Sequence, residues 1–117
     1  MWYSYVRAEL DNNNCVTAQV TTNPQSPWFS GHFPGNPILP GVAQLHMVTA
    51  SIAKVLHKEF VLHSVARIKF RKLIRPGDVL DIHAETGKKD NHYTFQITSE
   101  QQEVCSGRLV LAPKKEQ

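Results

Sequence analysis

The feature that most constrains this chain is a short segment rich in proline and glycine that leads directly into a long apolar segment. Residues 31–41 read GHFPGNPILPG and contain three prolines, three glycines and one histidine. Each proline fixes φ and removes a backbone N–H, whereas glycine permits positive φ or close approach of the backbone to a ligand. The segment therefore predicts a rigid loop that holds one shape in front of a helix.

The segment that follows this loop, residues 42 to about 57, carries apolar residues on more than one helical face. A helix that is apolar nearly all round is typically buried, so we expect this one in the interior. Because the first N–H groups of a helix are unpaired, its start at Gly41 favours negative charge. Polar side chains within a buried helix need partners or a role, and they are Gln44, His46, Thr49 and Ser51.

Alternation of apolar and polar residues predicts strands on both sides of the helix. We expect two strands before it and four after it, at residues 2–8, 15–21, 66–71, 80–85, 93–98 and 104–112. One helix followed by a meander of antiparallel strands indicates an α+β fold, in which the helix packs on one face of a curved sheet. The length predicts a single domain over residues 1–117. A chain of this size buries only about two-thirds of its unfolded surface, so association would help it.

Composition excludes several classes of protein. The net charge of +3 is mild and the basic residues form no long run, which argues against nucleic acid as a partner. No apolar stretch approaches the ~20 residues of a membrane span, and the N-terminus does not resemble a signal peptide, so we expect a cytoplasmic protein without membrane contact. Cys15 and Cys105 are expected to be free thiols. Neither they nor His57, His63, His83 and His92 show metal-ligand spacing, so no metal site is predicted.

Residues 31–42, GHFPGNPILPGV, resemble the signature of the (3R)-hydroxyacyl-acyl carrier protein dehydratases, which have the hotdog fold. Residues 67–80 are similar to that family's strand and Pro-Gly-Asp turn, and residues 104–112 to its last strand. The resemblance covers residues 28–112 in the right order. It implies an antiparallel sheet wrapped around one long central helix.

The resemblance also implies a reaction, which is the elimination of water from a 3-hydroxyacyl thioester to give the trans-2-enoyl thioester. Such a reaction belongs to fatty acid synthesis or to polyene or polyketide-like synthesis, and no cofactor or metal is implied. A base must remove a proton from C2, an acid must protonate the leaving hydroxyl, and the carbonyl must be polarised. In the family, the histidine at the position of His32 transfers the proton and the glycine at the position of Gly41 supplies an N–H.

The family's active site lies at a homodimer interface, so a homodimer with possible higher assembly is implied here. The acyl chain of the family's substrate runs in a tunnel between the subunits. By this resemblance the tunnel would be lined by Phe33, Ile38, Leu39, Pro40, Val42, Leu45 and Met47. For any single one of these residues, a place in the apolar core is the better explanation.

One position departs from the family pattern. The family has an acidic residue four positions after the motif's valine, and this chain has His46 there. The next acid in the chain is Glu59, which a rise of ~1.5 Å per helical residue places out of reach, and Gln44 points away from His46 on a helix. A protonated His46 can act as the acid, but burial and a second cation would disfavour its charged form.

This departure keeps several readings open. His46 is either the non-standard acid or a sign of a weakened site. Two other functions remain on the same fold: an acyl thioesterase in which His32 orients water, and an acyl-chain or carrier-protein binding subunit that accompanies a competent dehydratase.

The partner that the resemblance implies is an acyl carrier protein, which is acidic. Basic residues lie close together on and after one predicted strand, and they are Arg67, Lys69, Arg71, Lys72 and Arg75. Some of them are expected to border the tunnel mouth and to steer the carrier electrostatically. An ordinary solvated strand face explains the same residues equally well.

Overall fold

The computed structural model describes residues 2–24 and 41–115 of the chain. Its elements are β1 (Tyr3–Leu10), β2 (Val16–Thr22), α2 (Gly41–Leu56), β3 (Phe60–Phe70), β4 (Val79–Thr86), β5 (His92–Ser99) and β6 (Gln102–Pro113). All six predicted strands and the predicted helix are present. Strand β3 begins six residues before the predicted start at residue 66, because its exposed Val61 and Val65 are apolar and the sequence therefore shows no strict alternation there.

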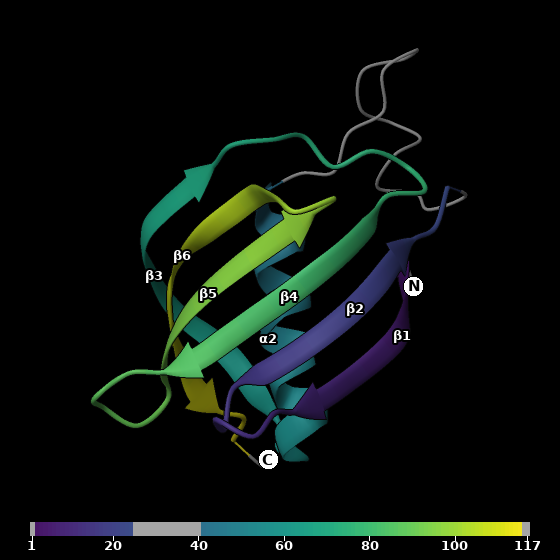
Figure 1. Ribbon diagram of the computed structural model, residues 1–117. Helices are drawn as coiled ribbons and strands as arrows, with labels where there is room; N and C mark the ends of the chain where they lie inside the picture. Colours follow the sequence, from purple (N-terminus) through teal and green to yellow (C-terminus); the bar gives the residue numbers. More distant parts are fainter. Residues whose placement is uncertain (1, 25–40, 116–117) are drawn as a thin grey trace.

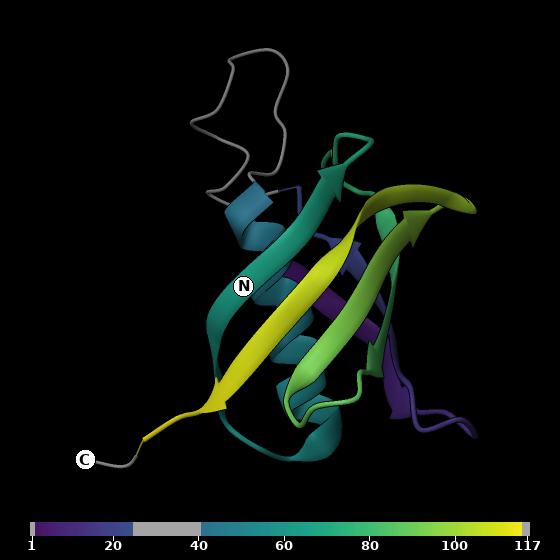
Figure 2. The same cartoon turned by 90° about the vertical axis from the view of Figure 1, so that its left-hand side faces the viewer.

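The strands form one sheet in the order β1-β2-β4-β5-β6-β3, and every neighbouring pair is antiparallel. Helix α2 lies behind this sheet in Figure 1, and Figure 2 shows from the side that the sheet curves around it. The helix contacts β1, β2, β3 and β4. This arrangement confirms the α+β hotdog fold, and no described helix is long and apolar enough to span a membrane.

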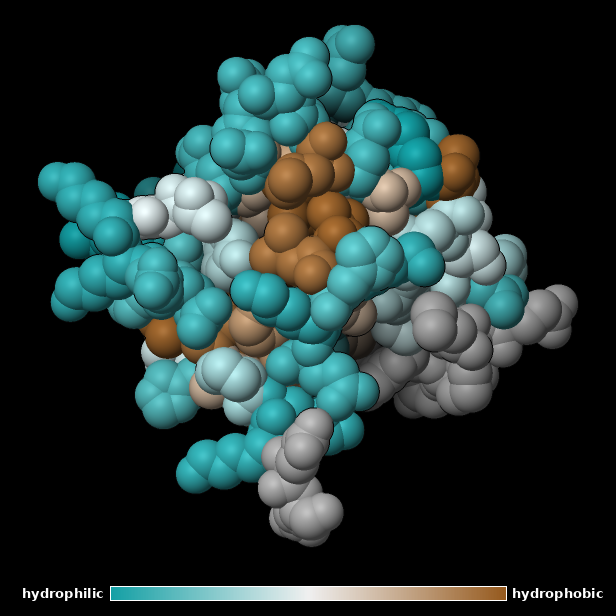
Figure 3. All heavy atoms as spheres, turned by 90° about the horizontal axis from the view of Figure 1, so that it is seen from below, coloured by the Kyte–Doolittle hydropathy of each residue, from teal (hydrophilic) through white to brown (hydrophobic). Residues whose placement is uncertain are grey.

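The core lies between the concave face of the sheet and one side of α2. Every second residue of β2 is buried, from Val16 to Thr22, as expected for a strand with one face on a core. The helix contributes a matching set of buried residues, which are Ala43, Gln44, Met47, Val48, Thr49, Ser51 and Ile52. Seen from the end at which α2 terminates, apolar side chains gather at the surface among hydrophilic ones (Figure 3), so the interior reaches the surface there.

Most of the polar side chains on the buried side of α2 have partners. Thr49 Oγ1 donates to the carbonyl of Leu45 at 3.0 Å, and Ser51 Oγ donates to the carbonyl of Met47 at 2.8 Å. Ser51 Oγ also lies 3.0 Å from the hydroxyl of Tyr5, which joins β1 to the helix. Gln44 is buried, and its Oε1 has no hydrogen-bond partner among the described residues.

The prediction that α2 is buried on all sides is wrong for one stripe of the helix. Val42, His46, Ala50 and Lys54 are exposed, and they recur every fourth residue. Residues at this spacing lie on the same helical face. The curved sheet covers the rest of α2 and leaves this face open in a single chain.

Candidate active site

The start of α2 lies directly against the end of β3. A Cβ built on Gly41 would come within 2.6 Å of Cζ of Phe70, so the bare backbone of Gly41 is what allows the ring to sit there. Phe70 is itself 53% exposed, and Val42, the next residue of the helix, is also 53% exposed. The first turn of α2 is therefore an apolar surface that is open to the outside of the chain.

His46 lies one turn further along the open face of α2 and is exposed. It lines a shallow groove with Trp2, Tyr3, Met47, Thr49, Ala50 and Phe60. The described residues of this groove include no carboxylate. A group that reacts with His46 must therefore come from the substrate, from residues outside the described ones or from a second chain.

The other candidate residues fall into two groups. His32, Phe33, Ile38, Leu39 and Pro40 lie outside the described residues, so their roles stay predictions. Gly41, Val42 and Leu45 are described: Leu45 is partly buried and packs against the core cluster, while Val42 faces outward. The structure thus places Val42 and His46 on one face of α2, with Gly41 at the start of the same helix.

Strand β3 forms a free edge beside this face. Among the residues that the structure describes, it is hydrogen-bonded to β6 on one side and ends the sheet. Three of its large apolar side chains are exposed, namely Val61 at 46%, Val65 at 43% and Phe70 at 53%. A long edge strand with unpaired backbone groups and apolar side chains is a template for pairing with another chain.

The five basic residues named from the sequence are all exposed, on β3 and in the loop that follows it. Arg71 forms an ion pair with Glu103, and Lys72 Nζ lies 3.4 Å from Oε1 of Gln102. Because Phe70 contacts Gly41, its neighbours Lys69 and Arg71 lie near the start of α2. The pKa of Glu103 is held below its usual value, since Gln96 and Arg71 donate hydrogen bonds to the carboxylate.

Both cysteines are free, as predicted. Burial raises the pKa of the Cys105 thiol to about 12, so this group is inert. Cys15 lies instead beside His83 and Glu85, a grouping that sequence reasoning missed. Residue 15 is too far from residues 83 and 85 in the sequence for a spacing motif to join them. Only the pairing of β2 with β4 could have predicted that they meet.

Comparison with known proteins identifies what this chain resembles. The model of the ApeI-like family, described as "ApeI dehydratase", matches residues 8–108. That range begins within β1 and ends within β6, so it contains the whole of α2 and the candidate site.

Two curated relatives and one solved structure are similar along most of the chain. The 3-hydroxyacyl-[acyl-carrier-protein] dehydratase FabZ of Rickettsia bellii is 34% identical over 99 residues, 77% of this chain and 68% of the relative. The FabZ of Pediococcus pentosaceus is 34% identical over 112 residues, 86% of this chain and 74% of the relative. The dehydratase heterocomplex ApeI:P from Xenorhabdus doucetiae contains a chain that is 28% identical, with a TM-score of 0.83 and coverage of 96% of this chain and 99% of that one.

Proposed function

Because this chain belongs to the ApeI-like dehydratase family, we propose that it eliminates water from a 3-hydroxyacyl thioester to give the trans-2-enoyl thioester. A proton leaves C2, the hydroxyl on C3 leaves as water, and no electrons are exchanged with a cofactor. The pathway would be fatty acid synthesis or a polyene or polyketide-like synthesis. The similarity to two FabZ dehydratases supports this reaction class.

The observation that carries the proposal is the open face of α2, where Val42 and His46 are exposed one turn apart, with Gly41 at the start of the helix against Phe70 of β3. One chain leaves this surface uncovered. We therefore place the reaction at an interface in which two β3 strands lie edge to edge. A homodimer formed in this way would cover the apolar side chains of β3 and enclose the first turn of α2.

In this proposal the first turn of α2 binds the thioester carbonyl. The N–H of Gly41 has no partner within the helix, and the positive end of the helix dipole lies at the same point. Negative charge develops on the carbonyl oxygen as the C2 proton leaves, so donors held there in advance lower the barrier. A side chain at residue 41 would meet the Phe70 ring, which makes glycine the residue that suits this position.

His32 is proposed as the base that takes the C2 proton, since an imidazole titrating near ~6.5 suits proton transfer at neutral pH. His46 is proposed as the acid that protonates the leaving hydroxyl. Its exposure in the single chain lets solvent and the substrate reach the ring. After each turnover His32 releases its proton to water and His46 regains one.

The test separates the candidate reactions by their products. Purified protein is incubated with a 3-hydroxyacyl thioester, and enoyl formation and free thiol are followed together. Enoyl product supports the dehydratase, whereas thiol release without enoyl product would replace it with a thioesterase. His32→Ala should abolish enoyl formation. His57→Asn, an exposed histidine at positive φ after the other end of α2, serves as the matched control and should retain it.

A second function has one observation in its favour. The groove beside His46 has no carboxylate among its described residues, and a similar structure is a heterocomplex of dehydratase chains. The chain would then be a subunit that binds the acyl chain and depends on a different chain for the acid. His46→Glu distinguishes a dehydratase with a weakened site from a dependent subunit. Increased turnover by the protein alone favours the weakened dehydratase site. Unchanged binding of the acyl thioester without turnover favours the dependent subunit.

The proposed physiological substrate is carried by an acyl carrier protein, in the cytoplasm. Lys69, near the start of α2, and Lys72, in the loop after β3, are exposed and suit an acidic carrier. Lys69→Glu and Lys72→Glu should raise KM for carrier-bound substrate and leave a small thioester unaffected. Lys88→Glu, on the turn between β4 and β5, is the control, and an equal effect of all three changes would dismiss this docking surface.

A further inference from the structure

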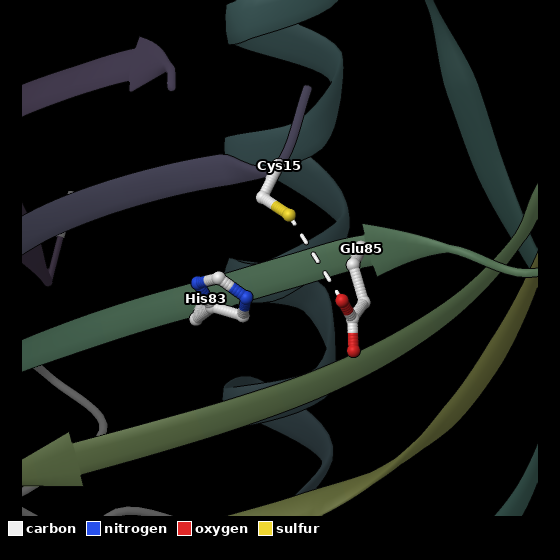
Figure 4. Close-up of side chains that lie close together, drawn as sticks. All are labelled: Cys15, His83 and Glu85. Atoms are coloured by element: carbon white, nitrogen blue, oxygen red, sulfur yellow. Dashed lines mark hydrogen bonds between the residues drawn. The ribbon is translucent and has the colours of Figure 1, made fainter. Parts of the chain in front are cut away.

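Three potential metal ligands lie together on the outer face of the sheet, on the side opposite α2. They are Cys15, just before β2, and His83 and Glu85 of β4 (Figure 4). One ligand atom from each lies within 4.8 Å of the other two, and Cys15 Sγ is 3.9 Å from Oε2 of Glu85. We infer that these three side chains bind one Zn²⁺ ion.

The strand register explains why the three side chains meet. Val16 pairs with Ala84, and Thr17 pairs with His83. Continuing the same antiparallel register places Cys15 opposite Glu85 and diagonal to His83. His83 and Glu85 are two residues apart on one strand, so both point to the outer face while Ala84 between them is buried against the core.

The donor set suits zinc. A thiolate, an imidazole and a carboxylate are the groups that bind Zn²⁺ in proteins, at about 2.3 Å for sulfur and about 2.0–2.2 Å for nitrogen and oxygen. Tetrahedral geometry at those lengths sets the ligand atoms roughly 3.3–3.8 Å apart. His83 and Glu85 are both exposed, so rotation about their side-chain bonds can close a gap of about 1 Å. The fourth position would be open to water.

The charges around the three ligands favour a cation. No ion pair between the residues that the structure describes involves Glu85 or Asp11, and both carboxylates add negative charge beside Cys15. Burial and these two negative charges also raise the pKa of the Cys15 thiol. When zinc binds, the S–H bond gives way to an S–Zn bond and the proton passes to solvent, without any redox change.

The turn before β2 holds Cys15 in place. Oδ1 of Asp11 accepts hydrogen bonds from the backbone N–H groups of Asn13 at 2.8 Å and of Cys15 at 3.0 Å. Asp11 therefore acts as a positioning residue that fixes the backbone of the sulfur ligand. The ion would fasten this turn to β4, on the face of the sheet away from the proposed active site, so binding can be tested without measuring dehydratase activity.

The experiment uses untagged, reduced, metal-free protein titrated with Co²⁺, which reports a thiolate ligand and tetrahedral geometry by its absorption. We expect a sulfur-to-cobalt charge-transfer band and strong visible bands that saturate at one equivalent, and Zn²⁺ should abolish both by displacing the cobalt. Cys15→Ser should lose the charge-transfer band although Cys105 remains. His83→Gln and Glu85→Gln should each weaken binding at least tenfold, whereas His63→Gln and Glu100→Gln should bind as the wild type does.

A second measurement guards against a variant that misfolds. Zn²⁺ should raise the Tm of the wild type and of the two control variants, and it should leave the Tm of His83→Gln unchanged, since that exposed substitution preserves the fold. Absence of a charge-transfer band in the wild type, or the same band and the same Tm shift in Cys15→Ser and His83→Gln, would overturn the inference.

Discussion

The two edges of the sheet are built differently. Strand β1 is the shorter edge, has a bulge between Tyr5 and Arg7, and carries charges on its outside. Arg7 lies 3.5 Å from Glu9 and 3.8 Å from Asp81, which links the edge to β4. Bulges and charged side chains are devices by which an edge strand discourages pairing with another chain. Strand β1 therefore ends the sheet within one chain.

Strand β3 also has bulges and exposed charged residues, Arg67 and Lys69, but it differs from β1 in its length and in its apolar side chains. It has 11 residues, and Val61, Val65 and Phe70 are exposed along it. Its bulges lie between Leu62 and Ser64 and between Ala66 and Lys69, and they bend the strand. They leave its exposed apolar side chains in place. An exposed apolar side chain does not by itself distinguish the two edge strands, because Val6 of β1 is 59% exposed as well. What distinguishes β3 is the position of Phe70, whose exposed ring lies against Gly41 at the start of α2.

The largest effect, a loss of dimer affinity, is expected when a negative charge is placed on β3 and not when the same charge is placed on β1. Val65→Asp should raise the dimer Kd at least 100-fold, equivalent to about 3 kcal/mol, because a carboxylate would be desolvated in the interface. Activity should fall with the dimer. Sedimentation equilibrium at several protein concentrations measures the change.

Val6→Asp is the matched control, since the residue is more exposed than Val65 and lies on the other edge strand. It should leave both association and activity unchanged. If Val6→Asp dissociates the protein and Val65→Asp does not, the assignment of the two edges is reversed.

A smaller effect is expected where β3 meets the helix. Gly41→Ala would press a methyl group against the Phe70 ring, and overpacking of this kind typically costs ~1–3 kcal/mol. The low end, about 1 kcal/mol, is expected here because the ring is half-exposed and can turn aside. Urea unfolding measures the free energy.

The double variant Gly41→Ala/Phe70→Ala tests the contact itself. Removing the ring should restore most of the stability lost in Gly41→Ala, so the two changes should be non-additive. Additive losses would mean that residue 41 is constrained by something other than Phe70.

Both the alternating strands and the helix were readable from the sequence, because their patterns depend on neighbours two to four residues apart. The interior strands β2, β4 and β5 bury one face and alternate clearly. The first half of β3 was missed, since its exposed Val61 and Val65 are apolar, so apolar and polar residues do not alternate there. The open face of α2 was missed for a related reason: Val42 and Ala50 are apolar, and composition alone does not say which chain covers them.

The candidate functional residues also differ in whether the sequence could reveal them. Gly41 and His46 could be named because they belong to a continuous motif whose spacing is fixed by a loop and a helix. The Cys15, His83 and Glu85 cluster could not, because it depends on how residue 15 is aligned with β4. A shift of one residue in that register would turn the β2 side chains to the opposite face.

A hydrogen bond ties the β1 edge to the helix, and the described part of the chain shows no side-chain hydrogen bond between β3 and α2. Ser51 is fully buried, and its Oγ lies 3.0 Å from the hydroxyl of Tyr5. Ser51→Ala should destabilise the fold by about 1 kcal/mol, because the partly buried tyrosine hydroxyl loses this partner. Ser64→Ala on the exposed surface of β3 should change stability by less than about 0.5 kcal/mol. Urea unfolding measures both losses of unfolding free energy. Equal losses in Ser51→Ala and Ser64→Ala would mean that the hydrogen bond to Tyr5 does not stabilise the β1 edge.

The smallest effect concerns the loop after β3, which Arg71 ties to β6 through Glu103. The pKa of Glu103 is lowered in the folded chain by the hydrogen bonds from Gln96 and Arg71. A lowered pKa means that the carboxylate stabilises the fold at pH values above its unfolded pKa of about 4.3, and that this contribution is lost as the pH falls through the folded value. Glu103→Gln should therefore lower Tm slightly at pH 7, and the difference from the wild type should vanish in strong acid. Glu100→Gln, an exposed change outside any ion pair of the described residues, should show no such dependence. If the Tm difference between Glu103→Gln and the wild type stays constant across the pH range, Glu103 acts through packing. The β3 edge would then lack an ion pair that stabilises it in the way Arg7 is proposed to stabilise β1.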